Sequence, residues 1–226
     1  MQRVLFLFFV IPFLAAQTVT EVEITSEPSH HLRFSEWGGP QVFSIELAPH
    51  ASTLLHRHRH DYVSVTLGDA HVLDESEGKP PVDLKLIDGD TRFTPGNFAH
   101  VVKNLSDQPF RDVMIEFPSE WKTRHAASSR GKESGEKTFP GGRIKTLFVR
   151  DGVRVSEINL DPGATVPNHR YDGRHFVVAI SDLDLRSDID GMDPMPLKFE
   201  PGDVKWLPGG YTNTGLRAAR FVTLGF

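Results

Sequence analysis

Residues 56–61 read His-Arg-His-Arg-His-Asp and concentrate metal-binding side chains in one short stretch. Residues two apart in a β-strand point to the same face. We therefore expect His56 and His58 on one face, and Arg57 and Arg59 on the other. Two imidazoles about 6–7 Å apart along a strand can bind one cation. An exposed strand of basic side chains is the alternative interpretation.

A second stretch, Gly89 to Asn104, contains a single histidine, His100, within an apolar segment typical of a β-strand. A Gly-Asp pair and a Pro-Gly pair precede it, and both are typical of turns. Taken alone, such a histidine is most often a hydrogen-bonded residue of the core. Together with the first stretch, it becomes a candidate third ligand.

The chain contains an internal repeat with an offset of 113 residues. The matches, in order, are Leu47–Ala51 with Leu160–Ala164, 56–58 with 169–171, 89–90 with 202–203, and 95–96 with 208–209. Solenoid repeats have periods of about 20–50 residues, so a period this long indicates two tandem domains. We predict domains at 17–119 and 138–226, joined by a polar linker at 120–137.

Strand patterns occur in both halves. Val42–Leu47 and Val153–Ile158 alternate, while Val63–Leu67 and Phe176–Ile180 are rich in β-forming residues. Short strands at roughly ten-residue spacing, with frequent Gly and Pro between them, are typical of sandwiches and jelly-roll barrels. The prediction is an all-β protein.

The N-terminus is typical of a secretory signal peptide. Arg3 precedes an almost wholly apolar run, Val4 to Leu14, and Ala15-Ala16-Gln17 supplies small residues for cleavage. The run is shorter than the roughly 20 residues that span a bilayer. We expect residues 1–16 to be removed and the mature chain to be secreted or periplasmic. A retained membrane anchor is the alternative. The absence of cysteine leaves no thiol to oxidise there.

These residues together resemble the cupin superfamily. Its second motif places Gly, Pro, His and Asn at set spacings, and Gly89, Pro95, His100 and Asn104 fall on all four. Its first motif contains His-x-His followed by an acidic residue. His56 and His58 match the pair, and Asp61 takes the acidic position because it lies seven residues before Gly68. The resemblance covers both halves, and it implies two tandem cupin-like jelly-roll β-barrels, a bicupin.

The resemblance also implies a metal site in the first barrel. One divalent transition metal (Fe, Mn, Ni, Zn or Cu) would be bound by His56, His58 and His100, with Asp61 as the fourth protein ligand. The turn before Asp61 is shorter than in the family, so His60 is a competing candidate. Such a site leaves one or two coordination positions open for water, O₂ or a chelating substrate.

The second half retains only part of this pattern. His169 keeps the first histidine, but Tyr171 replaces the second, His175 takes the acidic position and Asn213 replaces the last histidine. This set suits a divalent cation poorly. We interpret the second barrel as structural, covering the first or forming a homodimer. A pocket in which these four residues bind an organic ligand is the alternative.

The net charge of −5, with both signs mixed along the chain, gives no footprint for nucleic acid and no basic arm for a membrane surface. By analogy with the family, the leading hypothesis is a metal-dependent oxygenase acting on a small organic substrate. A hydrolase, lyase or isomerase using the same metal follows closely. The alternatives from other classes are a non-catalytic exported protein that binds a metal or small ligand, and a barrel with adventitious metal. The pattern identifies no catalytic residue.

Overall fold

The structure is a computed structural model that describes residues 20–35, 38–118, 135–166, 175–188, 193–207 and 210–225. In these ranges the chain is made of β-strands and one short 3₁₀ helix, which confirms the predicted all-β class. Within the same ranges, no helix is long and apolar enough to cross a membrane. The predicted signal peptide, residues 1–16, lies outside them.

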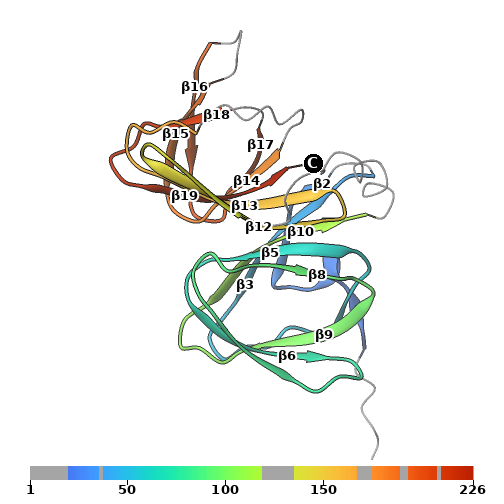
Figure 1. Ribbon diagram of the computed structural model, residues 1–226. Coiled ribbons are helices and arrows are strands. Elements are labelled where there is room, and N and C mark those ends of the chain that lie inside the picture. The colour runs from blue at the N-terminus through green and yellow to red at the C-terminus, as the bar shows by residue number, and fades with distance from the viewer. Residues whose placement is uncertain are drawn as a thin grey trace, which may run out of the picture.

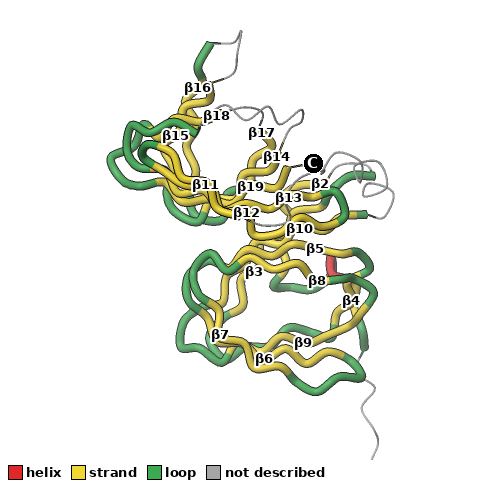
Figure 2. The backbone as a smooth tube through the Cα atoms, viewed as in Figure 1, coloured by secondary structure: helices red, strands yellow, loops and turns green. Residues whose placement is uncertain are grey.

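The first half of the chain forms two facing sheets that close into a barrel (Figures 1 and 2). One sheet has the order β1-β4-β9-β6-β7 and the other β2-β3-β10-β5-β8. Their elements are β1 (Val22–Glu23), η1 (Ile24–Ser26), β2 (His30–Ser35), β3 (Gln41–Leu47), β4 (His56–His58), β5 (Asp61–Thr66), β6 (Ala70–Ser76), β7 (Val82–Leu86), β8 (Thr91–Thr94), β9 (Phe98–Asn104) and β10 (Phe110–Phe117).

The second half repeats this arrangement. A sheet of order β11-β12-β13-β19-β14-β17 faces a smaller one of order β16-β15-β18. The strands are β11 (Gly135–Phe139), β12 (Gly142–Arg150), β13 (Val153–Leu160), β14 (His175–Ala179), β15 (Leu183–Asp188), β16 (Met195–Phe199), β17 (Val204–Leu207), β18 (Gly210–Asn213) and β19 (Ala219–Gly225). Because β11 begins at Gly135, residues 135–137 of the predicted linker belong to a strand.

Equivalent turns show that the internal repeat is structural. The amide of Gly89 donates to Thr66, and the amide of Gly202 donates to Ala179, each pair shifted by the same 113 residues. Both glycines have positive φ, 85° and 94°, a conformation that residues with a Cβ rarely adopt. The same tight turn therefore precedes β8 in the first barrel and β17 in the second.

The two barrels pack against each other through the outer faces of β5 and β10 in the first and β13, β14 and β19 in the second (Figure 1). This shared apolar layer consists of Val42, Val63, Val65, Leu67, Val113, Ile115, Phe117, Val153, Val155, Phe176, Val178, Ile180, Val222 and Leu224. The barrels therefore share one buried interface. Arg220 of the second barrel supports it with a charge-assisted hydrogen bond to Asp88 of the first, at 2.7 Å.

We predict that Ile115→Ala destabilises the protein by about 2–5 kcal/mol, because it opens a cavity in this layer, where Ile115 is 0% exposed. Ile87→Ala is the matched control, since that side chain is 64% exposed and its loss should cost about 0.5 kcal/mol or less. Urea unfolding of both variants measures the difference. Equal costs would contradict the packing of the two barrels described above.

Candidate metal centre

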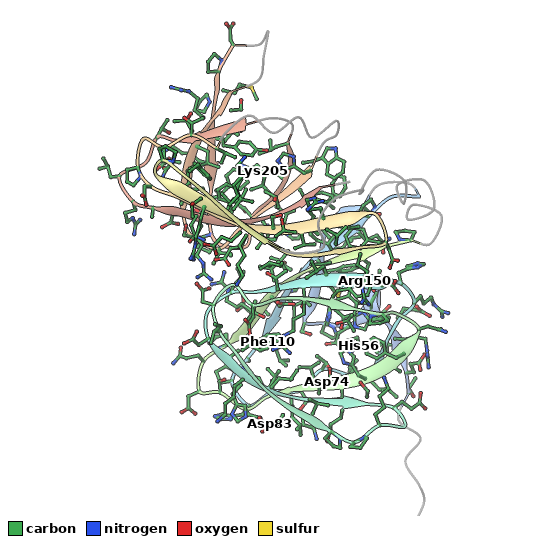
Figure 3. The ribbon with its side chains drawn as sticks, viewed as in Figure 1. His56, Asp74, Asp83, Phe110, Arg150 and Lys205 are labelled. Atoms are coloured by element: carbon green, nitrogen blue, oxygen red, sulfur yellow. The ribbon has the colours of Figure 1, made fainter. Side chains whose placement is uncertain are left out.

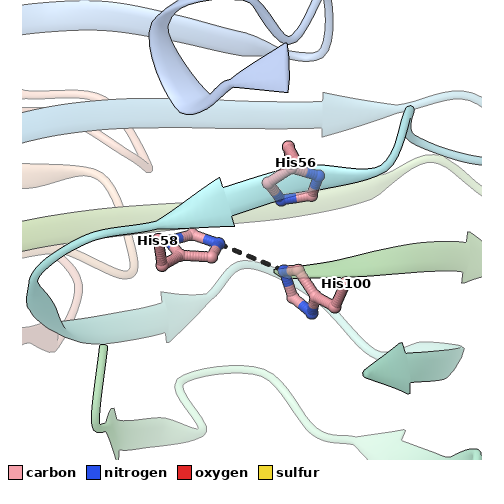
Figure 4. A group of neighbouring side chains, drawn as sticks. All are labelled: His56, His58 and His100. Atoms are coloured by element: carbon pink, nitrogen blue, oxygen red, sulfur yellow. Dashed lines mark hydrogen bonds between the residues drawn. The ribbon is translucent and has the colours of Figure 1, made fainter. Parts of the chain in front are cut away.

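Three histidines converge inside the first barrel from two neighbouring strands (Figure 4). His56 and His58 lie on β4, and His100 lies directly opposite His56 on the antiparallel strand β9. Since residues two apart share a face, all three rings point into the barrel. One ligand nitrogen from each lies within 4.8 Å of the others, and the side chains are buried. The structure thus brings together the three histidines expected from the sequence.

Each ring is oriented by a hydrogen bond through its Nδ1 atom. His56 donates to the carbonyl of Leu54 at 2.9 Å. His58 donates to Glu116 Oε1 at 3.0 Å, and His100 donates to Asp74 Oδ1 at 3.0 Å. A neutral imidazole that donates through Nδ1 leaves Nε2 as an unprotonated acceptor. Three lone pairs therefore face one another in the barrel interior.

This arrangement is electrostatically incomplete without a cation. The Nε2 atoms of His58 and His100 are 3.1 Å apart, a hydrogen-bond distance (Figure 4) that requires a proton which the two Nδ1-donating tautomers do not carry there. The buried Nε2 of His56 has no hydrogen-bond partner. A proton is a poor occupant, because burial lowers the pKa of His56 to about 4 and also holds the pKa of His58 far below its ordinary value. The donor set fits a divalent transition metal, which takes neutral imidazole ligands oriented by such outer hydrogen bonds.

The outer hydrogen-bond partners come from two strands and from the loop that contains Leu54, so both sheets of the barrel orient the rings. Glu116 reaches His58 from β10 in the opposite sheet, and Asp74 reaches His100 from β6. Burial raises the pKa of Glu116 to about 7, and a bound cation would favour its charged form. For Asp74, burial acts to raise the pKa, but the hydrogen bond from His100 and nearby charges hold it below the usual value.

The three histidines border a cavity of about 150 Å³ within the first barrel. Figure 3 places His56, Asp74 and Phe110 inside this barrel, and all three line the cavity. Most of its wall is apolar, from Ile45, Leu47, Val72, Leu84, Leu86, Val102, Phe110 and Met114. The site therefore adjoins a space that can hold a small organic molecule.

Asp61, the predicted fourth ligand, lies outside the histidine group. Its carboxylate accepts the backbone N–H of Gly96 at 2.8 Å and so fixes the Pro95-Gly96 turn. The reason is strand alternation: in β5 the side chains of Tyr62, Ser64 and Thr66 line the cavity, which leaves Asp61 on the other face. In this structure the residue seven before Gly68 therefore contacts a turn and not the histidines.

The side chain of Tyr62, the next residue on β5, points into the barrel beside the site. Its ring lies 4.5 Å from that of His58 (centroid to centroid), and Phe98 stacks on His58 at 5.3 Å. His60, the competing candidate, is likewise absent from the histidine group. Arg57 and Arg59 face outward as expected, where they form ion pairs with Glu21 and Glu23 of the N-terminal segment.

A fourth buried histidine, His30, was not expected at the site. Its ring centroid lies 4.9 Å from that of His56, and it lines the same cavity. Ser29 donates its hydroxyl proton to Glu27, so it can only accept from His30 Nδ1, which leaves His30 Nε2 as an acceptor. The sequence signal was weak: His30 comes from an N-terminal strand outside both motifs.

Asn213 in the second barrel is the counterpart of Asn104, not of His100. The Asn104 amide donates to the carbonyls of Leu47 and Gln108, and the Asn213 amide donates to those of Leu160 and Arg217. The repeat offset has shortened here from 113 to 109 residues, so the segment between the Pro-Gly pair and Asn213 is four residues shorter than its counterpart in the first barrel. The hydrogen bonds of the Asn213 amide hold a turn.

His175 is the other described member of that predicted pocket. It is buried on β14, and its Nε2 lies 2.5 Å from the hydroxyl of Tyr211. Burial lowers its pKa to about 4. His169 and Tyr171 lie outside the described residues. Among the residues that the structure describes, the histidine triad of the first barrel is the one group with metal-ligand geometry.

No family model matches the chain, and no curated protein matches it. Solved structures do match. Oxalate decarboxylase of Bacillus subtilis at pH 4.6 is 15% identical with a TM-score of 0.59, over 83% of this chain and 68% of that one. A structure of the same enzyme from a study of its Mn(II) centres is 14% identical with a TM-score of 0.56 over the same shares. The fold is that of the cupin jelly-roll proteins.

We predict that His100→Ala abolishes stoichiometric binding of a divalent metal, because two imidazoles remain from a site built of three. His169→Ala, the change at the equivalent of His56 in the repeat, should leave the metal content unchanged. Elemental analysis of untagged protein measures both. Equal loss in the two variants would refute the asymmetry between the barrels.

The outer hydrogen bonds give a second expectation. Glu116→Leu should weaken metal affinity by about 10–100-fold, since His58 loses the acceptor that orients it. Asp61→Asn should leave that affinity nearly unchanged, because its carboxylate contacts the Gly96 backbone and not the site. Competition with a chelator of known affinity measures both. A large effect from Asp61→Asn would restore Asp61 as a ligand.

Proposed function

We propose that this chain is an exported bicupin and a metal-dependent oxygenase, acting on a small organic substrate in the first barrel. The observation that carries the proposal is the convergence of three buried, unprotonated imidazole nitrogens beside a cavity. A structural barrel would have no reason to leave the Nε2 of His56 buried and unpaired, because such a group is costly to desolvate.

Bound at the triad, a divalent transition metal would supply Lewis-acid and redox chemistry to a substrate in the cavity. His56, His58 and His100 would hold it, while Leu54, Glu116 and Asp74 keep the rings in place. Three neutral imidazoles do not offset the charge of the cation. The site therefore favours an anionic, chelating oxygen group on the substrate.

The cavity walls position the rest of such a molecule. The apolar side chains exclude water and hold a carbon skeleton by contact. His30 Nε2 is an acceptor beside His56 and can accept a hydrogen bond from a substrate hydroxyl. Tyr62, whose pKa is raised by burial, stays protonated and borders His58.

A second candidate reaction is decarboxylation of a small carboxylate. The solved structures that share this fold include those of oxalate decarboxylase, which is a lyase. A site of neutral ligands that favours an anionic group also suits this reaction. Both candidate reactions use the same histidines and the same cavity. They differ in whether the bound substrate reacts with O₂ or loses CO₂.

Export is part of the proposal and rests on the pattern of residues 1–17 and on the absence of cysteine. N-terminal sequencing of the protein from its native compartment tests it. A mature chain that starts near Gln17 or Thr18 supports export, and a chain that retains residues 1–16 contradicts it.

The function is tested on protein reconstituted with Fe(II) or Mn(II) and supplied with catechols, flavonols and small organic acids that include oxalate. We expect O₂ uptake with at least one compound, lost in His100→Ala together with the metal. Release of CO₂ without O₂ uptake would assign the decarboxylase reaction. Tight binding of metal and compound without turnover of any would overturn catalysis and leave a binding protein.

A further inference from the structure

A polar group lines the cavity two rows of side chains away from the residues that contact His58. The inward side chains of the sheet β3-β10-β5-β8 form successive rows across the strands. The first row contains Tyr62 and Glu116, which contact His58. The row two steps further along contains Thr66 and Asp112. Asp112 is four residues from Glu116 on β10, which is roughly 13 Å along an extended strand.

Asp112 is the unexplained member of this group. Its side chain lines the cavity, the residue is 5% exposed, and its Oδ1 atom is buried without a hydrogen-bond partner. Thr66 hydrogen bonds to the carboxyl group, and burial raises its pKa to about 8, so the acid carries its proton at neutral pH. A buried carboxyl group with an unpaired oxygen is costly and calls for a ligand that satisfies it.

Arg92 adds a positive charge to the cavity wall between these two rows. It lies opposite Ser64 on β8, in the row between Tyr62 and Thr66, and its side chain also lines the cavity. Its Nη2 lies 3.6 Å from Asp90 Oδ2, a long ion pair that leaves the guanidinium able to bind another acceptor. A cation here disfavours a positively charged ligand group and favours an oxygen acceptor.

We propose that Asp112 and Arg92, with Thr66, form a distal subsite that binds a carboxylate or carbonyl oxygen at the far end of the substrate. The substrate is then an elongated molecule with oxygen groups at both ends. One end faces the histidine triad, the apolar middle contacts Met114 and Val102, and the other end accepts hydrogen bonds from Asp112 and Arg92. This inference rests on the proposed function, because the first end needs the metal.

Dicarboxylates of increasing length test the distal subsite directly. The protein is loaded with Co(II), and its visible absorption spectrum is followed during titration with glutarate, adipate and suberate. Each is compared with the monocarboxylate of the same chain length and with 6-aminohexanoate. We expect one length of dicarboxylate to bind about tenfold or more tightly than its monocarboxylate, as expected for hydrogen bonds to a charged group.

Variants assign that preference to the subsite. Asp112→Leu, of similar size but apolar, should abolish the preference for the dicarboxylate. Arg92→Leu should reduce this preference, and it tests the subsite even where Asp112→Leu does not fold. Asp112→Asn keeps an N–H donor and should retain part of it. Asp83→Asn is the matched control, since Asp83 binds His71 on the exterior.

The outcomes separate this inference from the proposed function. Failure to load Co(II) with one ion per chain would refute the metal site, and the inference with it. Loading with equal affinity for mono- and dicarboxylates, or a preference unchanged in Asp112→Leu, would refute the distal subsite alone. Preference for 6-aminohexanoate would also overturn it, because Asp112 would then act as the counter-ion of an ammonium group.

Discussion

The first barrel is organised around three imidazole nitrogens whose lone pairs converge in a buried space. Each ring is held by a hydrogen bond through its other nitrogen, and a bound cation would satisfy the lone pairs that converge. The supporting atoms come from three places: the carbonyl of Leu54, β6 through Asp74, and the opposite sheet through Glu116. Leu54 is itself held, because its amide donates to Glu27 at 2.8 Å. The geometry of the site is therefore a property of the closed barrel and not of the histidine motif alone.

The packing of the two barrels explains how the first can place polar side chains on the inner face of β5 and β10. The outer side chains of these strands are Val63, Val65, Val113, Ile115 and Phe117, which pack on the second barrel. Tyr62, Thr66, Asp112 and Glu116 point inward. An isolated barrel with this pattern would expose a large apolar face to water. The second barrel covers that face, and its own cluster around Leu160 and Phe221 fills its interior with apolar side chains. The first barrel thus contains the cavity beside the triad, and the second barrel covers the apolar outer face of the first.

The two halves of the chain share the residues that hold turns, but they do not share all the positions of the histidine triad. Gly89 and Gly202 occupy the same tight turn, and Asn104 and Asn213 hold the same loop through the same three kinds of hydrogen bond. These residues satisfy backbone groups that any barrel of this shape must satisfy. His100 lies in the segment between the Pro-Gly pair and Asn104, which is four residues shorter in the second half. The loss of a ligand position and the shortening of the chain therefore occur in the same segment.

The sequence by itself determined the all-β class and the repeat, and strand alternation placed His56 and His58 on one face. His100 joined this pair through the resemblance to the cupin motifs. The sequence also placed Arg57 and Arg59 on the outer face. Only the tertiary structure decided which face of β5 and β10 is interior, and so replaced Asp61 by Tyr62 beside the site. A strand buried on both faces gives no hydrophobic signal that distinguishes inside from outside. The sequence did not reveal four further residues of the site or the cavity: His30, Asp74, Glu116 and Asp112. They come from strands that are distant from the histidine motifs in sequence, and spacing along the chain does not predict which distant strands meet.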